Sequence, residues 1–132
     1  MKYCILRPLT SKRAAEVAYQ LIDIFLMFGA PQILQSDNGS EFTAFIITEL
    51  KLLWPELLIV HGKPRHPQSQ GSVERLNCDV KDMLIAWLGD NNCTDWPVGL
   101  KFVQFSKNSR FHSGIKQSPY MALFGSNPRV GL

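Results

Sequence analysis

A helical spacing of apolar residues appears in two stretches of the first half of the chain. Apolar side chains recur every three or four positions from residue 14 to residue 25, and the same spacing returns from residue 42 to residue 53. This periodicity predicts two amphipathic helices, each with one face toward a core. Thr10 or Ser11 is predicted to cap the first helix, and Ser40 the second, because a hydroxyl oxygen can accept from the unpaired N–H groups of a first turn.

Three short apolar runs lie around these two helices. They are Tyr3-Cys4-Ile5-Leu6, Ile33-Leu34 and Leu57-Leu58-Ile59-Val60. Each run is too short for a buried helix, so the pattern predicts strands. Strands that alternate with helices are typical of an α/β domain. The polar stretch 62–72, rich in Gly, Pro, Gln and Ser, is predicted to be an exposed loop.

The second half of the chain reads as three helices. A long apolar stripe predicts a helix from Val73 to about Leu88. Thr94 or Asp95 is predicted to start the next helix, which reaches Lys107. Ser118-Pro119 places a cap and a first-turn proline before a short helix that ends at Gly125.

Composition indicates one small globular domain, residues 1–132, since 45% of the residues are hydrophobic. The charge is uneven. Residues 96–132 hold five of the fourteen Lys and Arg and none of the eleven Asp and Glu, so residues 1–95 are net −2, with nine cations against eleven anions. A basic segment of this kind suits a polyanionic partner, although a solvated basic surface explains it as well.

Cysteine usage and hydropathy argue against secretion or a membrane span. Cys4, Cys78 and Cys93 are odd in number and lack Cys-x-x-Cys spacing, so neither a disulfide framework nor a zinc knuckle is predicted. The most apolar stretch, residues 21–34, is interrupted by Asp23 and by Gly29 and Pro31. We therefore expect no membrane partner.

Two carboxylates stand beside glycines in longer polar motifs. Asp37 lies in Gln35-Ser36-Asp37-Asn38-Gly39-Ser40-Glu41-Phe42, and Glu74 lies in His66-Pro67-Gln68-Ser69-Gln70-Gly71-Ser72-Val73-Glu74-Arg75-Leu76-Asn77. Paired carboxylates can hold the metal ions that phosphodiester chemistry needs. Each one also has a purely structural explanation, a β-turn for Asp37-Asn38-Gly39 and a helix-start carboxylate for Glu74.

Both motifs together resemble the catalytic core of retroviral and retrotransposon integrases, with their S/T-D-N-G-x-x-F and P-x-S-Q-G-x-V-E signatures. A third match follows at Asn108 to Ser113 and at Ser118-Pro119-Tyr120-Met121-Ala122-Leu123-Phe124-Gly125, which is typical of retrotransposon-type cores, including those domesticated in animal genomes. The resemblance runs from about Tyr3 to Gly125. Asn108 and His112 are interpreted as structural contacts rather than catalytic groups.

The resemblance implies an RNase H-like α/β fold and metal-dependent polynucleotidyl transfer in DNA integration. It makes Asp37 and Glu74 the catalytic carboxylates and ligands of Mg²⁺ or Mn²⁺, places Gln70 and Asn77 at the site and turns Lys81 toward the nucleic-acid backbone. Further DNA-contact candidates are Lys63, Arg65, His66 and Arg75. It also implies a homodimer, since cores of this family usually pair. The sequence has no secretory or transmembrane segment, and we expect a nuclear location.

One part of the family pattern is not matched. The family's triad begins with an Asp on a first, central strand, and a second strand follows it. Both precede the strand that Tyr3–Leu6 matches, and no acid stands before Glu16 here. We therefore expect an incomplete fold that lacks the first two strands, a weakly held metal and no catalysis by this chain alone. Two alternatives remain open: a non-catalytic DNA-binding or protein-interaction module derived from a transposable element, and an RNase H-like nuclease.

Overall fold

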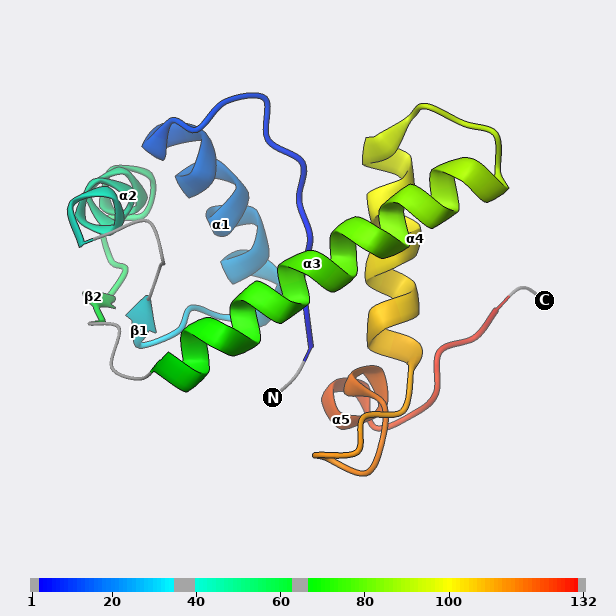
Figure 1. Ribbon diagram of the computed structural model, residues 1–132. Helices are drawn as coiled ribbons and strands as arrows, with labels where there is room; N and C mark the ends of the chain where they lie inside the picture. The colour runs from blue at the N-terminus through cyan, green and yellow to red at the C-terminus, as the bar shows by residue number, and fades with distance from the viewer. Residues whose placement is uncertain (1–2, 35–39, 63–66, 131–132) are drawn as a thin grey trace. The chain divides into compact units, whose positions relative to one another are not determined.

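The computed structural model describes residues 3–34, 40–62 and 67–130, in which helices and short strands follow one another (Figure 1). The elements are α1 (Ala14–Phe28), β1 (Ile33–Leu34), α2 (Ser40–Leu53), β2 (Val60–His61), α3 (Pro67–Asp90), α4 (Trp96–Ser109) and α5 (Pro119–Phe124). Internal contacts divide the chain into two compact units. The middle unit is Leu9–Arg75, and the terminal unit combines the described residues of Met1–Pro8 and Leu76–Leu132.

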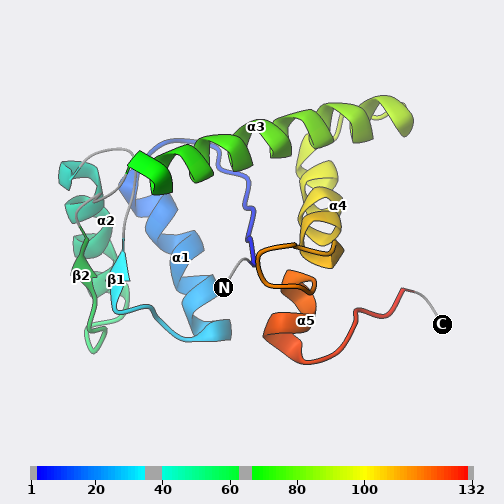
Figure 2. The ribbon, with the colours of Figure 1, turned by 60° about the horizontal axis from the view of Figure 1, so that its bottom comes forward.

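The middle unit is built on a helix pair and a parallel strand pair. Strands β1 and β2 lie side by side, with Ile33 opposite Val60 and Leu34 opposite His61 (Figure 2). The helices α1 and α2 pack on one another. The buried core comes from both helices and from the run before β2, and its members are Ala18, Phe25, Ile46, Leu50, Leu57 and Ile59. The apolar periodicity therefore predicted the core-facing sides of both helices, except at Leu53, which is 53% exposed at the end of α2.

The run before β2 alternates strictly between core and solvent. Leu57 and Ile59 are buried, whereas Leu58 and Val60 are exposed, as is Ile33 of β1. The predicted strand at Ile33-Leu34 is confirmed. The predicted strand Leu57–Val60 is corrected to Val60–His61, because ladder bonds to the short β1 reach only these residues.

The start of α1 corrects the predicted cap. The N-cap residue is Arg13, whose side chain makes no capping bond. Thr10 and Ser11 instead bind the side chain of Glu16: the Thr10 N–H donates at 2.7 Å and its hydroxyl at 2.8 Å, and the Ser11 hydroxyl donates to the other carboxylate oxygen. These donors, the Ser11 hydroxyl first, lower the pKa of Glu16 to about 2.

The first segment of the terminal unit corrects a second prediction. Among the described residues no strand pairs with Tyr3–Leu6, which was expected to be one. The backbone of this segment forms hydrogen bonds with side chains of α4 instead. The Cys4 N–H donates to Asn108 Oδ1 at 2.9 Å, and Asn108 Nδ2 donates to the Cys4 carbonyl at 2.8 Å. The Leu6 N–H donates to Gln104 Oε1 at 2.7 Å. Two side chains one helical turn apart thus replace a neighbouring strand.

The helix ends of the terminal unit follow the sequence signals. The side chain of Asp95 caps α4 by accepting from the Val98 N–H, and Ser118 caps α5 by accepting from the Met121 N–H. Gly125 ends α5 at φ 76°, a left-handed conformation that glycine adopts without strain. These three predictions are confirmed.

Side chains of α3 and α4 meet within the terminal unit, around Trp87 and Gly99. The Trp87 ring of α3 stacks on Phe102 of α4, with ring centroids 5.3 Å apart. A Cβ placed on Gly99 would lie 2.8 Å from both Leu84 Cδ1 and Trp87 Cε3. The absence of a side chain at Gly99 therefore allows this approach. The Tyr3 ring adds an edge contact to Phe124 of α5 at 6.0 Å.

Candidate metal and nucleic-acid site

Helix α3 carries most of the candidate residues. Gln70, Glu74, Arg75, Asn77 and Lys81 all fall within Pro67–Asp90. The helix was predicted to start at Val73, after a loop to residue 72, but its first residue is Pro67. Proline suits this position, since its missing N–H would be unpaired in a first turn anyway.

The spacing along α3 puts four of these residues on one stripe. Gln70 stands four residues before Glu74, whereas Asn77 and Lys81 stand three and seven residues after it, and these offsets return to the same side of a helix. Side chains of α3 are described from Arg75 onward. In that part Arg75, Asn77 and Lys81 are exposed, which a nucleic-acid contact requires.

The other candidates lie outside the described residues. Asp37 falls in 35–39, and Lys63, Arg65 and His66 fall in 63–66. The strands before them are described, however. Because β1 and β2 are parallel neighbours in register, the chain leaves both at the same end of the pair. The Gly62 N–H, just after β2, donates to the Leu34 carbonyl at the end of β1 at 2.9 Å.

No group of three His, Cys, Asp or Glu side chains able to hold a metal occurs within the described ranges. The three thiols of Cys4, Cys78 and Cys93 are free. Burial raises the pKa of Cys4 above its usual value.

An ion pair between α3 and α4 was not predicted. The Asp79 carboxylate accepts from Lys107 Nζ, and this bond, followed by the charges of Lys107 and Arg110, lowers the pKa of Asp79. The two residues are 28 positions apart, and no motif contains them both. The pair connects α4 to the exposed side of the helix that carries Glu74.

Asn108 and His112 make structural contacts, as the sequence indicated. Asn108 is buried and binds the backbone of Cys4. The His112 Nδ1 accepts from the Gly114 N–H at 3.1 Å inside the loop between α4 and α5. Neither side chain has a nucleophile or base as its bonding partner in these contacts.

Comparison with known proteins gives the chain its family. No protein-family model matches it. Human KRAB-A domain-containing protein 2 is 46% identical over 131 residues, 99% of this chain and 27% of that protein. The crystal structure of the BIV integrase catalytic core domain is 32% identical, with a TM-score of 0.64, and the match covers 86% of this chain and 72% of that one. The chain belongs to the integrase catalytic-core family.

Other relatives come from viruses. The Gag-Pol polyprotein of feline leukemia virus is 32% identical over 123 residues, 92% of the chain and 7% of the polyprotein. The HTLV-2 integrase core, solved in complex with magnesium in a trimeric form, is 19% identical at a TM-score of 0.64 over 84% of this chain and 70% of that one, which shows the fold alone. Likeness to a human protein beside viral polyproteins supports a domesticated form.

These likenesses confirm the predicted RNase H-like α/β fold. The described part of the integrase core contributes two strands to the sheet, as an incomplete fold predicts. The chain spans about a quarter of the length of its human relative and less of the polyprotein. None of the helices in the described ranges is long and apolar enough to cross a membrane.

Proposed function

We propose that residues 1–132 form part of one integrase core whose Asp37 and Glu74 hold Mg²⁺ or Mn²⁺ for transfer of a DNA strand. The register of β1 and β2 is the observation that carries this proposal, because it brings the chain leading to Asp37 and the chain leading to α3 to the same end of the sheet. Ligands bind at this end in open α/β sheets. Carboxylate oxygens suit both ions, and the HTLV-2 core was solved with magnesium.

The residues around Glu74 bind and orient the nucleic acid. A bound metal pair would supply charge stabilisation to the phosphoryl group and activate the attacking oxygen. Gln70 and Asn77 share the Glu74 side of α3 and line the site, and Lys81 lies one turn further along that side. Lys63, Arg65, His66 and Arg75 add phosphate contacts, so we expect duplex affinity to fall steeply as salt rises.

The chain tested alone should not catalyse strand transfer. Within these 132 residues no Asp or Glu precedes Glu16. The Glu16 carboxylate is already bound by Thr10 and Ser11, so it does not supply a third ligand. Two carboxylates give the metal fewer anionic ligands than a triad does, and weak metal binding follows.

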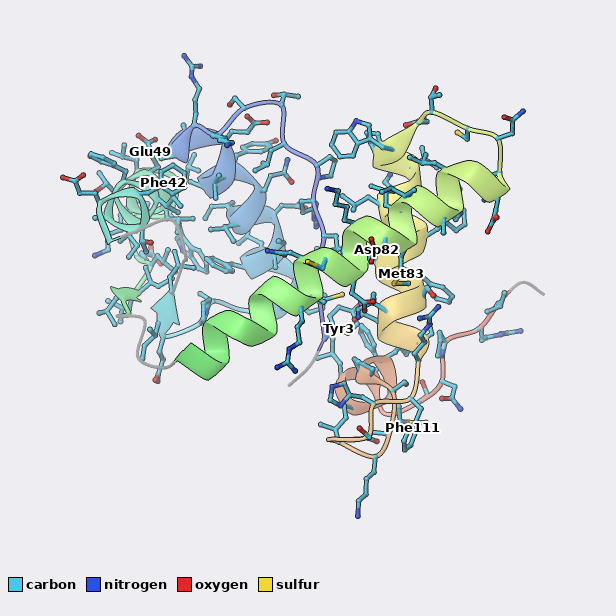
Figure 3. All side chains as sticks on the ribbon, in the orientation of Figure 1. Tyr3, Phe42, Glu49, Asp82, Met83 and Phe111 are labelled. Atoms are coloured by element: carbon cyan, nitrogen blue, oxygen red, sulfur yellow. The ribbon has the colours of Figure 1, made fainter. Side chains whose placement is uncertain are left out.

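Manganese binding, followed by electron paramagnetic resonance, tests the ligand pair. We expect the wild-type chain to bind Mn²⁺ weakly and the double variant Asp37→Asn with Glu74→Gln to lose this binding. Asp82→Asn is the matched control, since Asp82 is an exposed carboxylate of the same helix (Figure 3). Equal loss in the control and the double variant, or no loss in either, would overturn the proposal.

A non-catalytic DNA-binding or protein-interaction module is the second candidate function. The engagement of Glu16 with two hydroxyls favours it, because this carboxylate already has hydrogen-bond partners of its own. Such a module would bind its partner equally well in EDTA, and the double variant would bind duplex DNA like the wild type. An integrase site predicts instead that Mn²⁺ strengthens DNA binding and that the double variant abolishes this gain.

Pairing of two copies and a nuclear location complete the proposal. The HTLV-2 core was solved in a trimeric form, so at least one core of this fold self-associates. We propose a homodimer for this chain, to be measured by sedimentation equilibrium. DNA as the substrate places the protein in the nucleus, which a fluorescent fusion of the natural protein would test.

A further inference from the structure

The loop between α4 and α5, residues 110–117, presents a single aromatic ring to solvent. Phe111 follows directly after the C-cap residue Arg110, and 71% of Phe111 is exposed. Figure 3 labels Phe111 in this loop of the terminal unit. Inside the loop its exposed neighbours are polar or cationic, namely Arg110, Ser113, Gly114, Lys116 and Gln117. An isolated ring among such groups is not part of an apolar protein-docking patch within this loop.

The loop is a built structure rather than an open connection. His112 and Gln117 form an antiparallel bridge, with the His112 N–H donating to the Gln117 carbonyl at 2.9 Å. The Ile115 N–H donates to the His112 carbonyl at 3.2 Å, and the Gly114 N–H donates to the His112 ring at 3.1 Å. A Cβ on Gly114 would lie 2.9 Å from the His112 ring, so only glycine fits there without a shift. The ring of Phe111 therefore stands on a fixed stem.

Cations lie on and next to this loop. Arg110 and Lys116 are exposed on it, and Lys107 lies in the last turn of α4. The Asp79 carboxylate of α3 binds Lys107 and also interacts electrostatically with Arg110. Taken together, Lys107, Arg110 and Lys116 carry three positive charges against the one negative charge of Asp79. Residues 96–132 contain no further Asp or Glu to offset this positive excess.

We propose that residues 110–117 form a stacking platform for an unpaired DNA strand, with Phe111 against a base and Arg110 and Lys116 on the flanking phosphates. A ring with cations beside it is the recurrent device for single strands, because every unstacked base has a face to offer. Bases of a duplex are already stacked on one another, so a duplex offers phosphates and groove edges but no free base face. This inference rests on the proposed function only in taking DNA as the ligand. The platform itself does not involve Asp37 or Glu74.

Fluorescence anisotropy with the full chain tests the platform. The probes are a short fluorescein-labelled oligothymidine strand and a duplex of the same length, both in EDTA, so that failure of the metal site would not affect the result. We expect Phe111→Ala to weaken strand binding about tenfold and to leave duplex binding unchanged. The control is Phe45→Ala, since Phe45 is a similarly exposed ring, 60%, on α2 of the middle unit.

Two further variants separate stacking from charge and from misfolding. Phe111→Trp should keep the affinity for the strand, and its added fluorescence should be quenched on binding, whereas Phe45→Trp should show no quenching. Arg110→Gln and Lys116→Gln should each lower the slope of log affinity against log salt by about 0.7. The proposal is overturned if Phe111→Ala binds the strand like wild type, weakens strand and duplex alike, or matches Phe45→Ala.

Discussion

The two units of this integrase core hold their first segments by different forces. In the middle unit α1 is fixed by apolar burial, with Ala18 and Phe25 in the same core as Ile46 and Leu50 of α2. In the terminal unit the segment Tyr3–Leu6 is fixed by amide side chains of α4. Apolar burial is non-directional and tolerates small shifts, whereas amide bonds demand one register. We therefore expect substitutions in the two units to lower stability in different ways, through lost burial in the middle unit and through lost hydrogen bonds in the terminal unit.

Removing core volume from the middle unit should have the largest effect. Leu50 is 0% exposed, and Leu50→Ala should lower the free energy of unfolding by about 2–5 kcal/mol, through lost transfer energy and a cavity. Hydrogen exchange should show the loss of protection mainly in the middle unit. Leu52→Ala, on the exposed side of the same helix, is the control and should change stability little. Equal effects of the two substitutions would contradict the described core.

Removing the amide from the terminal unit should have the next largest effect. Asn108→Ala leaves the N–H and the carbonyl of Cys4 without their partner, which costs about 1–3 kcal/mol. Hydrogen exchange at Cys4 should accelerate, a change that simple loss of volume would not localise there. Asn127→Ala, at an exposed asparagine of the same unit, should leave that exchange rate unchanged.

A glycine pair tests the approach of α3 and α4. The Cβ of Gly99→Ala would press on Leu84 and the rigid Trp87 ring, which should lower the free energy of unfolding by about 1–3 kcal/mol. The higher helix propensity of alanine offsets about 1 kcal/mol of this loss. Gly89→Ala is the matched control, because a Cβ there meets nothing within 4 Å and should stabilise α3. Chemical denaturation should therefore show opposite signs. The same sign for both would mean that the helices are further apart than described.

The smallest effect concerns pH and the start of α1. The pKa of Glu16 is lowered to about 2, so its stabilisation is present above pH 4.5 and is lost as pH falls toward 2. Glu16→Gln should lower the melting temperature above pH 4.5, and the difference from wild type should shrink near pH 2. Glu56→Gln, at an exposed glutamate of the same unit, should show no such convergence.

Local signals in the sequence predicted a large part of the fold. The strand Ile33-Leu34, the core positions of α1 and α2 and the caps at Asp95 and Ser118 all rest on neighbours within a few positions. The partners of Asn108 and Gln104 are 104 and 98 residues away, and no periodicity connects them. Thr10 and Ser11 were expected to bind backbone, but the Glu16 carboxylate is a charged and therefore stronger acceptor for their hydroxyls.

The residues of the candidate site were predicted from their match to family motifs, and helical spacing predicted only which of them share one side of a helix. Spacing alone places Gln70, Glu74, Asn77 and Lys81 on one side of a helix, and the structure has this helix. The start of the helix at Pro67 was missed, because the Gly, Gln and Ser that follow the proline have the composition of a loop. The Asp79–Lys107 pair was missed as well, since a charge on each of two exposed helix faces gives no sign of its partner.

The exposed apolar side chains on the outward face of the strand pair have a consequence for the stability of the protein in cells. Parallel strands are normally covered on both faces, yet Leu58 is 89% exposed here, beside Val60 and Ile33. Chaperones and proteases select exposed apolar residues of this kind. We therefore expect quality control to remove the chain faster while this face is exposed. Leu58→Ser should lengthen the half-life of the chain in cells without changing the core.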